Sequence, residues 1–598
     1  MTTALDNSHY FSYADITSPG IKESNDDCVG CQIPPHYLLA QKGAVFVIAD
    51  GVSTAEAGRE ASHICVHELI REYYLTPVSW TVEQSARAVL QIINRQLYLR
   101  NGRFVDERRG FVTTLSLLII HGNQAHIFNI GDSRIYRIRG SEVEQLTEDH
   151  SGEHENGDRY LTRAMGIETV LRVDYFNLEV DSADAFLLTT DGFHDYIRLQ
   201  EYLNQLPDSL QEETLASWLS AGIEIALEKG SNDNLSGAFI ALREPLPQQD
   251  SVVPKSAHTR RGLPPIAPDL PDGLVLDGYR IIRELYASSR SQVYLVEDVE
   301  TKNSLAMVVP SSRFEEDIAY AEEFEKTEWI GKRVCHDNIV TVHQVQRPKS
   351  YLYEIIEYVY GINLEAWMLK YPNPTGGKVI KIAKQIIAAL QLFHSKGIIL
   401  RDLKPSNIMI TPDEQVKITK WSSACILGVT TASGSGATSN NDFNEVTLFD
   451  HGEFYGTLKY SDPCYRLGSL PNEKGDQYSL ASIIYEMLTG HTPYGNRLSR
   501  GDGAKELQLL TYDLSFKFNN KIPIWFDGTL KLALSAQPQE RYPTLGKFAH
   551  DLENPNPQFL TEEYFKNLEK TLPSIDVWKS LALIWLGSML LAFLVFLG

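Results

Sequence analysis

Cysteine is scarce in this chain of 598 residues, which contains only six. The cysteines lie at scattered positions, namely Cys28, Cys31, Cys65, Cys335, Cys425 and Cys464. So few thiols at irregular spacing exclude a disulfide framework for a chain of this length and indicate a reducing, cytosolic environment. Cys28 and Cys31 form a CxxC pair, but no second pair stands at zinc-ligand spacing, so we interpret the pair as coincidental.

Basic residues are also in deficit, with 55 Lys and Arg against 77 Asp and Glu and a formal net charge of −22. Nothing in the chain resembles a basic, phosphate-binding surface, which argues against a nucleic-acid partner. Residues 1–20 lack a basic start followed by an apolar run, so no signal peptide is predicted.

One long uncharged run stands at the C-terminus. Residues 580–598 contain no charged side chain, and as a helix they would extend about 28 Å, close to the apolar thickness of a bilayer. A helix buried at a domain edge would show a polar face, whereas this run is apolar all round, so we predict one transmembrane helix. Lys566, Lys570 and Lys579 precede it, and the positive-inside rule then predicts a single-pass protein of the inner membrane with its domains on the cytoplasmic side.

A proline-rich segment divides the rest of the chain. Seven prolines lie between Pro245 and Pro271, which is typical of a semi-extended linker. We therefore predict five segments: a first domain over 1–244, a linker over 245–276, a second domain over 277–552, a juxtamembrane segment over 553–579 and the membrane helix over 580–598. A low-complexity patch from Gly428 to Asn444 cannot bury enough apolar surface to order itself.

The first domain alternates strand-like and helical runs. Stretches rich in β-branched and aromatic residues predict strands at 44–50, 111–120, 125–132, 185–191 and 235–242. Apolar residues at helical spacing predict helices at 55–74, 82–98 and 215–227. The pattern predicts an α+β domain with sheets covered by helices.

Several of these strands begin or end at an aspartate. Asp50 closes one strand, Asp132 and Asp191 end two others, and Asp233 precedes a fourth. A single Asp-Gly is more often a turn, but acids gathered at the ends of buried strands are costly without cations among them. Oxygen-rich sites of this kind suit Mg²⁺ or Mn²⁺, and a pair of such ions can polarise a phosphate and activate a water.

The ordered motifs of this half resemble those of the protein phosphatase 2C family of metal-dependent Ser/Thr phosphatases. They include Gly20–Asp27, Ala49-Asp50-Gly51, Gly110–Thr114, Ile130–Arg134, Leu161–Gly166, Thr190–Asp195 and Ser231–Asn234. The resemblance implies an αββα sandwich and two or three Mn²⁺ or Mg²⁺ ions. It implies that Asp50 bridges two ions, that Gly51 and Asp26 bind one and that Asp191 and Asp233 bind the other. It also implies that Asp27 holds the reacting water and that Asp132 and Asp195 bind a third ion.

Three positions depart from the family pattern. Lys22 stands where the family has its phosphate-binding arginine, so the charge is kept but the bidentate fork is lost. Asp26 replaces a glutamate and is one methylene shorter. Val52 occupies the position of the proton-donating histidine of eukaryotic members.

The second domain resembles the protein kinases. Arg401–Asn407 matches the catalytic loop, in which Asp402 would orient a substrate hydroxyl, Lys404 would assist and Asn407 would hold Mg²⁺. Glu357 and Val359 lie in a segment similar to the hinge that contacts adenine. The resemblance implies a two-lobed kinase-like fold.

Other kinase features are missing. The expected glycine-rich loop, Tyr286–Val293, has no glycine, and Val308 stands where a phosphate-binding lysine is expected. The partner glutamate of that lysine falls at Thr327, with Glu328 one residue off. The metal-binding Asp-Phe-Gly reads Lys420-Trp-Ser422, and Cys464 replaces the glutamate that pairs with Arg541. We therefore predict a pseudokinase with doubtful ATP binding.

The sequence thus predicts a membrane-anchored enzyme that hydrolyses phosphoserine or phosphothreonine in a phosphoprotein, with a kinase-like regulatory or substrate-binding domain. Two alternatives stay open. One is a true bifunctional kinase and phosphatase that uses ATP, with Lys420 replacing the lost lysine. The other is an inactive scaffold that binds phosphoproteins.

Overall fold

The computed structural model divides the chain into two compact units, residues 1–263 and 264–598. The structure describes residues 10–52, 55–102, 110–153, 159–207, 210–244, 246, 264–288, 290–314, 317–345, 347–428, 459–467, 469–495 and 511–564.

Two five-stranded antiparallel sheets form the centre of the first unit. One sheet runs in the order β1 (Phe11–Ser18), β12 (Leu235–Leu242), β11 (Asp184–Thr189), β6 (Arg134–Arg139) and β7 (Glu142–Gln145). The other runs in the order β10 (Asp174–Glu179), β5 (Gln124–Ile130), β4 (Leu115–His121), β3 (Ala44–Asp50) and β2 (Asp27–Gln32). A short hairpin, β8 (Ser151–Glu153) and β9 (Arg159–Leu161), is separate from both.

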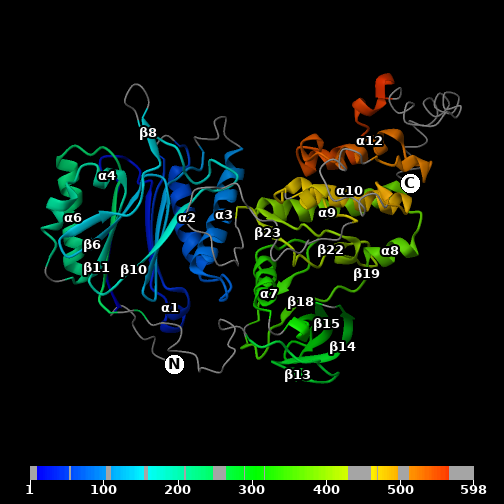
Figure 1. Ribbon diagram of the computed structural model, residues 1–598, viewed down its shortest axis with the longest axis horizontal. Helices are drawn as coiled ribbons and strands as arrows, with labels where there is room; N and C mark the ends of the chain where they lie inside the picture. Colours follow the sequence, from blue (N-terminus) through cyan, green and yellow to red (C-terminus); the bar gives the residue numbers. More distant parts are fainter. Residues whose placement is uncertain are drawn as a thin grey trace. The chain divides into compact units, whose positions relative to one another are not determined.

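The two sheets pack face to face, and helices cover their outer faces (Figure 1). Phe46 and Ile48 of β3 meet Phe186 and Ile240 of the facing sheet in the central core. On the outside, α2 (Gly58–Tyr73) covers β2 and β3, and α3 (Val82–Asn101) packs on α2. On the opposite side, α6 (Glu212–Glu228) covers β1 and β12. Because β3 is covered on both faces, its run of apolar residues shows no alternation.

In the described part of the first unit there are also three short helices, α1 (His36–Lys42), α4 (Asp191–His194) and α5 (Leu199–Leu203). The long helix α3 begins with a capping box, in which Thr81 and Gln84 satisfy each other's backbone N–H groups. The predicted αββα sandwich is confirmed.

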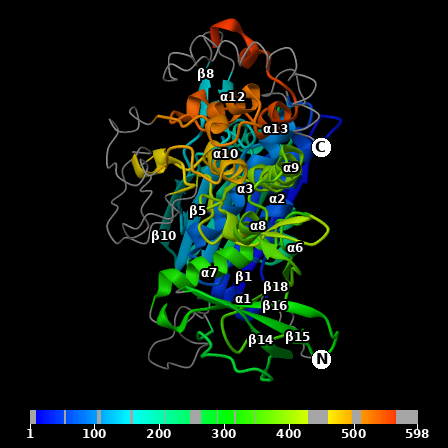
Figure 2. The ribbon, with the colours of Figure 1, turned by 90° about the vertical axis from the view of Figure 1, so that its right-hand side faces the viewer.

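The second unit has two lobes. The first contains a six-stranded sheet and α7 (Ile318–Gly331); the sheet order is β13 (Val275–Leu276), β14 (Tyr279–Ala287), β15 (Ser291–Asp298), β16 (Ser304–Pro310), β18 (Glu354–Glu357) and β17 (Val342–His343). The second lobe is helical, with α8 (Leu364–Lys370), α9 (Gly376–Ser395), α10 (Glu473–Thr489), α12 (Ile524–Ala533) and α13 (Leu545–Glu553). Four of these, α9, α10, α12 and α13, lie together (Figure 2).

The helical lobe also contains small sheets. They are β19 (Ile362–Asn363), β21 (Ile408–Ile410) and β22 (Val416–Ile418), and the pair β20 (Ile398–Ile399) and β23 (Cys425–Ile426). The predicted two-lobed kinase-like fold is therefore present.

The predicted linker is shorter than expected on its C-terminal side. From Pro264 the chain belongs to the second unit, and Ala267 and Leu270 are buried in the core of its sheet. The backbone N–H of Leu352 donates to the carbonyl of Pro265 at 2.8 Å. Prolines are compatible with this edge packing because it uses their carbonyl groups and needs no N–H.

Among the described residues, no helix has the length and apolar character needed to cross a membrane. The predicted span at 580–598 and the patch from 429 to 444 lie outside the described residues. The membrane helix therefore stays a prediction.

Candidate functional site

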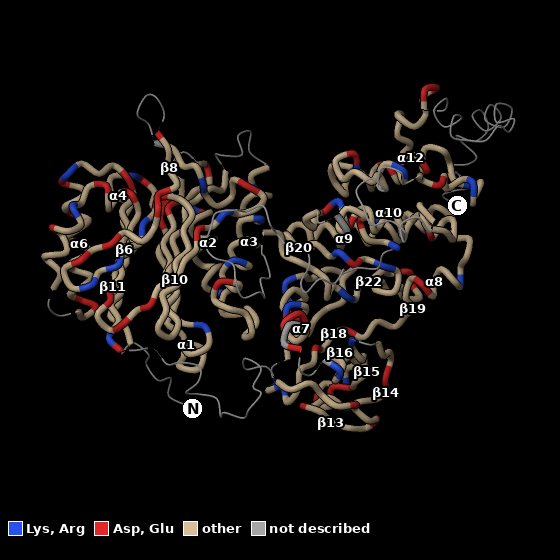
Figure 3. Tube along the Cα trace, in the orientation of Figure 1, with Lys and Arg blue, Asp and Glu red and all other residues tan. Residues whose placement is uncertain are grey.

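The predicted aspartates of the first unit meet at one end of the sandwich. Asp27 begins β2 and lies opposite Asp50, the last residue of β3. Asp191 follows β11 and opens α4, and Asp233 lies two residues before β12, the neighbour of β11. Acidic residues gather at the upper ends of these central strands in Figure 3. The structure therefore brings together carboxylates that are up to 206 residues apart in the sequence, from Asp27 to Asp233.

Asp27 is fixed from the facing sheet. The hydroxyl groups of Thr190 and Ser236 donate hydrogen bonds to its Oδ2 at 2.9 and 2.7 Å. Its Oδ1 is buried and has no hydrogen-bond partner among the residues that the structure describes. A buried carboxylate oxygen without a partner is costly. The carboxylate is thus held through its Oδ2, and Oδ1 would gain a partner from a bound cation.

The aspartates raise one another's pKa values. Burial and the nearby Asp191 and Asp233 raise the pKa of Asp27 to about 7, although its two hydroxyl partners oppose the shift. Burial and the Asp27 charge raise the pKa of Asp50 well above its usual value. Burial and then Asp233 raise the pKa of Asp191. Burial and then Asp191 raise the pKa of Asp132 to about 7. The cluster has an excess of negative charge.

The other predicted ligands surround this cluster. Asp26 is half-buried; its Oδ1 accepts from Ser24 at 2.9 Å, and its backbone N–H donates to Asn234 at 2.9 Å. Gly51 lies so close to α2 that an added Cβ would stand 2.4 Å from the Gly58 backbone, so only glycine fits. Asp195 is exposed and lies 3.9 Å from the Arg134 guanidinium.

Lys22 has a contact that the sequence did not indicate. Its ammonium group forms an ion pair with Asp233 and partly balances the acidic cluster. Gly20, at φ 60°, has no Cβ, which allows this loop to approach the Asp233 carbonyl. Lys22 thus stands at the predicted site, paired with a predicted metal ligand.

The donor set fits hard divalent cations. It consists of carboxylate oxygens with raised pKa values and one buried oxygen without a partner among the described residues. Bound cations would offset the repulsion between the carboxylates and would give the buried oxygen a partner. Within the described residues, the aspartates do not form a tight group of three side chains around one point. Mg²⁺ and Mn²⁺ sites commonly use few carboxylates and several waters, which is compatible with such spacing.

In the second unit, the catalytic-loop residues form one connected network. Lys404 Nζ lies 2.6 Å from Asp402 Oδ2, and Asn407 donates to the Asp402 carbonyl at 3.0 Å. Arg401 has φ 64°, a conformation that is strained for a residue with a side chain. The buried Asp476 holds this loop, because it accepts from the N–H of Leu400 at 2.9 Å and of Arg401 at 3.0 Å.

The structure corrects the predicted position of the helix α7 acid. Thr327 and Glu328 were expected there, but Glu328 pairs with Lys349 at 2.8 Å. Glu323, one turn earlier, pairs with Arg290 of the β14–β15 loop at 2.8 Å. This pair lies close enough to Lys420 to affect its pKa, and so do Lys404 and Asp402. Desolvation and the Lys404 charge lower the pKa of Lys420. Sequence reasoning missed Arg290 and Glu323.

The predicted hinge residues lie at the end of β18. Glu357 pairs with Leu305 of β16 in the sheet, and its carboxylate lies 2.8 Å from Lys417 Nζ. Val359 is half-buried and follows two residues later. The Glu357 side chain is therefore engaged within the chain, and its backbone N–H donates to the Thr341 carbonyl at 2.8 Å.

Arg541 keeps an acidic partner, contrary to the prediction based on Cys464. Its guanidinium forms a two-point ion pair with Asp462, with Nη2 2.9 Å from Oδ1, and both side chains are fully buried. Asp462 precedes Cys464 by two residues, so the loop supplies the missing charge from a neighbouring position.

Comparisons with known proteins agree with this division of the chain. Residues 24–238 match the model of the protein phosphatase 2C family, and residues 279–552 match the model of the protein kinase domain. The chain therefore carries a phosphatase 2C domain fused to a protein kinase domain.

Two similar curated proteins are named serine/threonine-protein kinases. A Clostridium acetobutylicum protein named a probable serine/threonine-protein kinase is 27% identical over 292 residues, which cover 49% of this chain and 42% of that protein. The serine/threonine-protein kinase PrkC of Bacillus subtilis is 24% identical over 303 residues, covering 50% and 44%. The chain thus spans less than half the length of these relatives. Because they are named kinases, they do not support the pseudokinase prediction.

Two solved structures are similar to parts of this chain. PppA, described as a key regulatory component of T6SS in Pseudomonas aeruginosa, is 26% identical with a TM-score of 0.33 and covers 39% of this chain and 98% of its own. The PknI kinase domain of Mycobacterium tuberculosis is 23% identical with a TM-score of 0.36 and covers 48% and 98%.

Proposed function

We propose that the first unit is a metal-dependent phosphatase that hydrolyses phosphoserine or phosphothreonine in proteins. The observation that carries the proposal is the orphaned, buried Oδ1 of Asp27 inside a cluster of acids with raised pKa values. The match to the phosphatase 2C model over residues 24–238 supports it.

The residues divide the task among them. Asp50, Gly51, Asp26, Asp191 and Asp233 would hold two Mn²⁺ or Mg²⁺ ions, and Asp132 and Asp195 a third. Such ions, when bound, polarise a phosphate and lower the pKa of water. Asp27, held by Thr190 and Ser236, would orient the attacking water through its free oxygen. Once cations neutralise the acids, the Lys22 ammonium group would leave Asp233 and bind the substrate phosphate.

The test is hydrolysis of a phosphothreonine peptide by the full chain with Mn²⁺. Wild type should release phosphate in a Mn²⁺-dependent manner, and Asp191→Asn should abolish the release. The matched control is Asp181→Asn, an exposed acid outside the cluster with a side chain that is 61% accessible, which should keep full activity. Absence of activity in the wild type would favour the scaffold alternative and overturn the proposal.

A second candidate function is phosphoryl transfer by the kinase domain. It is favoured by the connected network of Asp402, Lys404 and Asn407, and by Lys420 and Arg290 near it. These cations could neutralise a bound nucleotide in place of the missing lysine at Val308. Because the loop over the phosphates has no glycine, nucleotide affinity should be weak.

Nucleotide binding and transfer separate this candidate from a pseudokinase. ATP with Mg²⁺ should raise the melting temperature of the full chain, and Lys420→Met should remove most of the rise. Transfer of labelled phosphate should stop in Asp402→Asn, whereas Asp413→Asn, an exposed acid in a turn of the same lobe, should retain it. Lack of both stabilisation and transfer would leave the kinase domain as a regulatory or substrate-binding module.

We further propose that residues 580–598 anchor the protein in the inner membrane, with the domains on the cytoplasmic side. The uncharged run supports this proposal. The full chain should sediment with membranes and resist carbonate extraction, whereas Leu590→Arg should release it. The conservative control Leu590→Ile should remain in the membrane fraction.

A further inference from the structure

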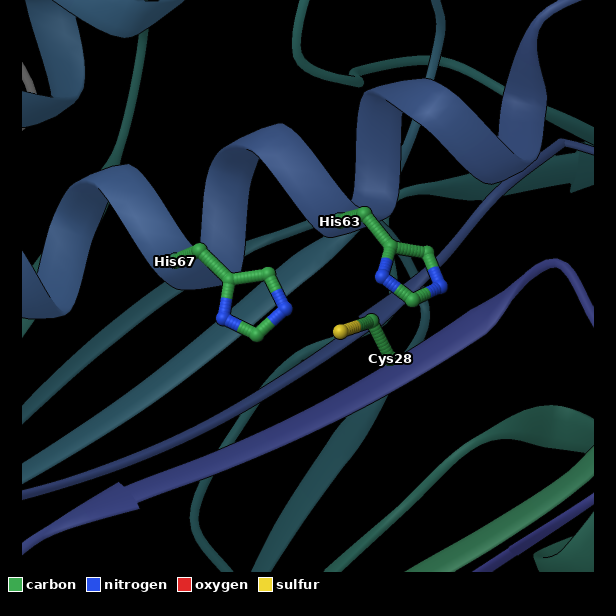
Figure 4. Close-up of side chains that lie close together, drawn as sticks. All are labelled: Cys28, His63 and His67. Carbon is green, nitrogen blue, oxygen red and sulfur yellow. The ribbon is translucent and has the colours of Figure 1, made fainter.

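Three potential metal ligands converge on the outer side of the phosphatase sandwich. The Cys28 thiol lies on β2, and the His63 and His67 imidazoles lie on α2, with one ligand atom of each residue within 4.8 Å of the other two. Figure 4 shows both imidazoles and the thiol turned toward one another across the space between helix and strand. Among the described residues, no other group of three or more His, Cys, Asp or Glu side chains has ligand atoms this close together.

The backbone fixes this geometry. His63 and His67 are four residues apart on α2, so both project from the same face of the helix. Helix and strand pack closely because Gly30, on the same strand face as Cys28, has no side chain. An added Cβ there would stand 2.5 Å from Val66 and 2.8 Å from Ile70. The contact between α2 and β2 is therefore tight, and it sets the distance from the thiol to the imidazoles.

The cluster is distinct from the CxxC pair. Successive side chains of a strand point to opposite faces, so Cys31 faces away from Cys28. Its neighbours are Tyr13 and Asp15 of the facing sheet, and it packs beside the central core. The two cysteines cannot bind one ion, which agrees with the interpretation of the CxxC spacing as coincidental. The partners of Cys28 are instead the two histidines.

The three ligand atoms have no competing use. Within the described part of the chain, no hydrogen bond or ion pair engages the Cys28 thiol or either imidazole. Cys28 is buried, His63 is half-buried and His67 is exposed. An ion can therefore enter from the solvent side at His67, and that side leaves room for water as a further ligand.

We propose that Cys28, His63 and His67 form a binding site for a zinc-class transition-metal ion. One thiolate and two imidazoles are soft and borderline donors that suit Zn²⁺, and three protein ligands with one open position make a tetrahedral site with water. The ligand atoms around such an ion lie roughly 3.3–3.7 Å apart. Rotation of the two histidine side chains closes the remaining gap. Binding releases the thiol proton to solvent.

The site is chemically separate from the aspartate cluster although it is adjacent in sequence. Cys28 follows Asp27, but their side chains point to opposite faces of β2. Ser62, the residue before His63, donates to the Asp26 carbonyl at 2.6 Å. An ion at this site therefore joins α2 to β2 directly behind the predicted phosphatase centre. The aspartates favour hard ions with oxygen ligands, whereas this site favours ions that bind sulfur and nitrogen.

Cobalt substitution provides the test, with the full chain and Co²⁺ as the probe in the presence of excess Mg²⁺. Wild type should show a thiolate-to-cobalt charge-transfer absorption that one equivalent of Zn²⁺ removes. Cys28→Ser should lose this absorption. His67→Gln changes only an exposed side chain, so its fold should be intact, and it should weaken Zn²⁺ binding at least about tenfold.

The controls separate this site from others. Cys31→Ser, on the opposite strand face, and His36→Gln, outside the cluster, should bind Co²⁺ as wild type does. Asp191→Asn should keep the absorption even when it lacks phosphatase activity. The proposal is overturned if wild type shows no charge-transfer absorption, or if His67→Gln binds Zn²⁺ as tightly as wild type.

Discussion

The two catalytic-type clefts of this chain balance their charges in opposite ways. In the phosphatase unit, burial and neighbouring carboxylates raise the pKa values of Asp27, Asp50 and Asp191, and among the described residues one oxygen of Asp27 is buried without a partner. In the kinase unit, three acids near the predicted nucleotide site each pair with a base of the same chain. The pairs are Asp402 with Lys404, Glu323 with Arg290 and Glu357 with Lys417.

This difference shows what each cleft needs from outside. A cluster of like charges is stable only if cations or protons neutralise it, so the phosphatase centre depends on its ions. A site whose acids are paired with bases of the same chain gains less from a ligand, because the ligand must first displace the existing partners. The predictions below test this contrast.

The largest expected effect is the loss of phosphatase activity in Asp27→Asn. The asparagine can still accept from Thr190 and Ser236, so the local geometry should survive while the charge is lost. Ion-assisted activation of water contributes several kcal/mol, and the rate with Mn²⁺ should therefore fall about a thousandfold. Phosphate release from a phosphothreonine peptide measures the effect.

The kinase cleft provides the comparison for this variant. Asp27→Asn should leave the ATP-induced thermal stabilisation of the full chain unchanged, since that cleft is in the other unit. A phosphatase rate within tenfold of wild type would show that the cluster does not need the Asp27 charge.

The next effect concerns the buried pair of the kinase unit. Arg541→Met leaves Asp462 buried and unpaired, which should destabilise the unit by about 3–5 kcal/mol. Hydrogen exchange in α10 and α13 of the full chain should accelerate accordingly. The exposed pair of Lys381 and Glu414 is the control, because Lys381→Met should cost about 1 kcal/mol or less. Equal effects of the two substitutions would contradict the role assigned to Asp462.

A third prediction concerns pH. Asp27 and Asp132 have folded-state pKa values of about 7, above the usual aspartate value. The folded state therefore holds protons that the unfolded state releases, and stability is lost as pH rises toward 7. Without divalent ions, the free energy of opening that hydrogen exchange measures in β3 and β11 should fall by on the order of a few kcal/mol between pH 5 and pH 8.

Added Mn²⁺ should reverse this dependence, because ions compete with protons for the same carboxylates. Asp132→Asn should flatten the metal-free profile and stabilise the unit at pH 8. A metal-free profile that rises with pH would contradict the uncompensated charge.

The sequence predicted the buried strands well and the exposed ones poorly. The strands at 44–50 and 235–242 coincide with β3 and β12, since both consist of apolar residues covered on two faces. The strand expected from Phe111 begins only at Leu115, because the Phe111 N–H is taken by Asn101 at 2.5 Å. Strand β10 was missed because it is an edge strand with few buried residues.

The site residues show the same division. The aspartates were predicted for two reasons. Each lies near the end of a buried strand, and the resemblance to the phosphatase family extends over the whole domain. The pairs of Glu323 with Arg290 and of Asp462 with Arg541 were missed because they depend on the three-dimensional position of loops. The spacing of His63 and His67 was visible in the sequence, but only the structure places Cys28 beside them.

The smallest effect is expected at Lys22, the base that faces the acidic cluster. If its charge serves both Asp233 and the substrate phosphate, then Lys22→Met should lower kcat/KM about tenfold, mainly through KM, since a charge-assisted hydrogen bond contributes about 1.5–3 kcal/mol. Lys22→Arg restores the bidentate fork and should lower KM below the wild-type value. Steady-state kinetics with the phosphothreonine peptide and Mn²⁺ measure both variants. A fall in kcat with unchanged KM for Lys22→Met would instead assign Lys22 to the balance of the metal centre alone.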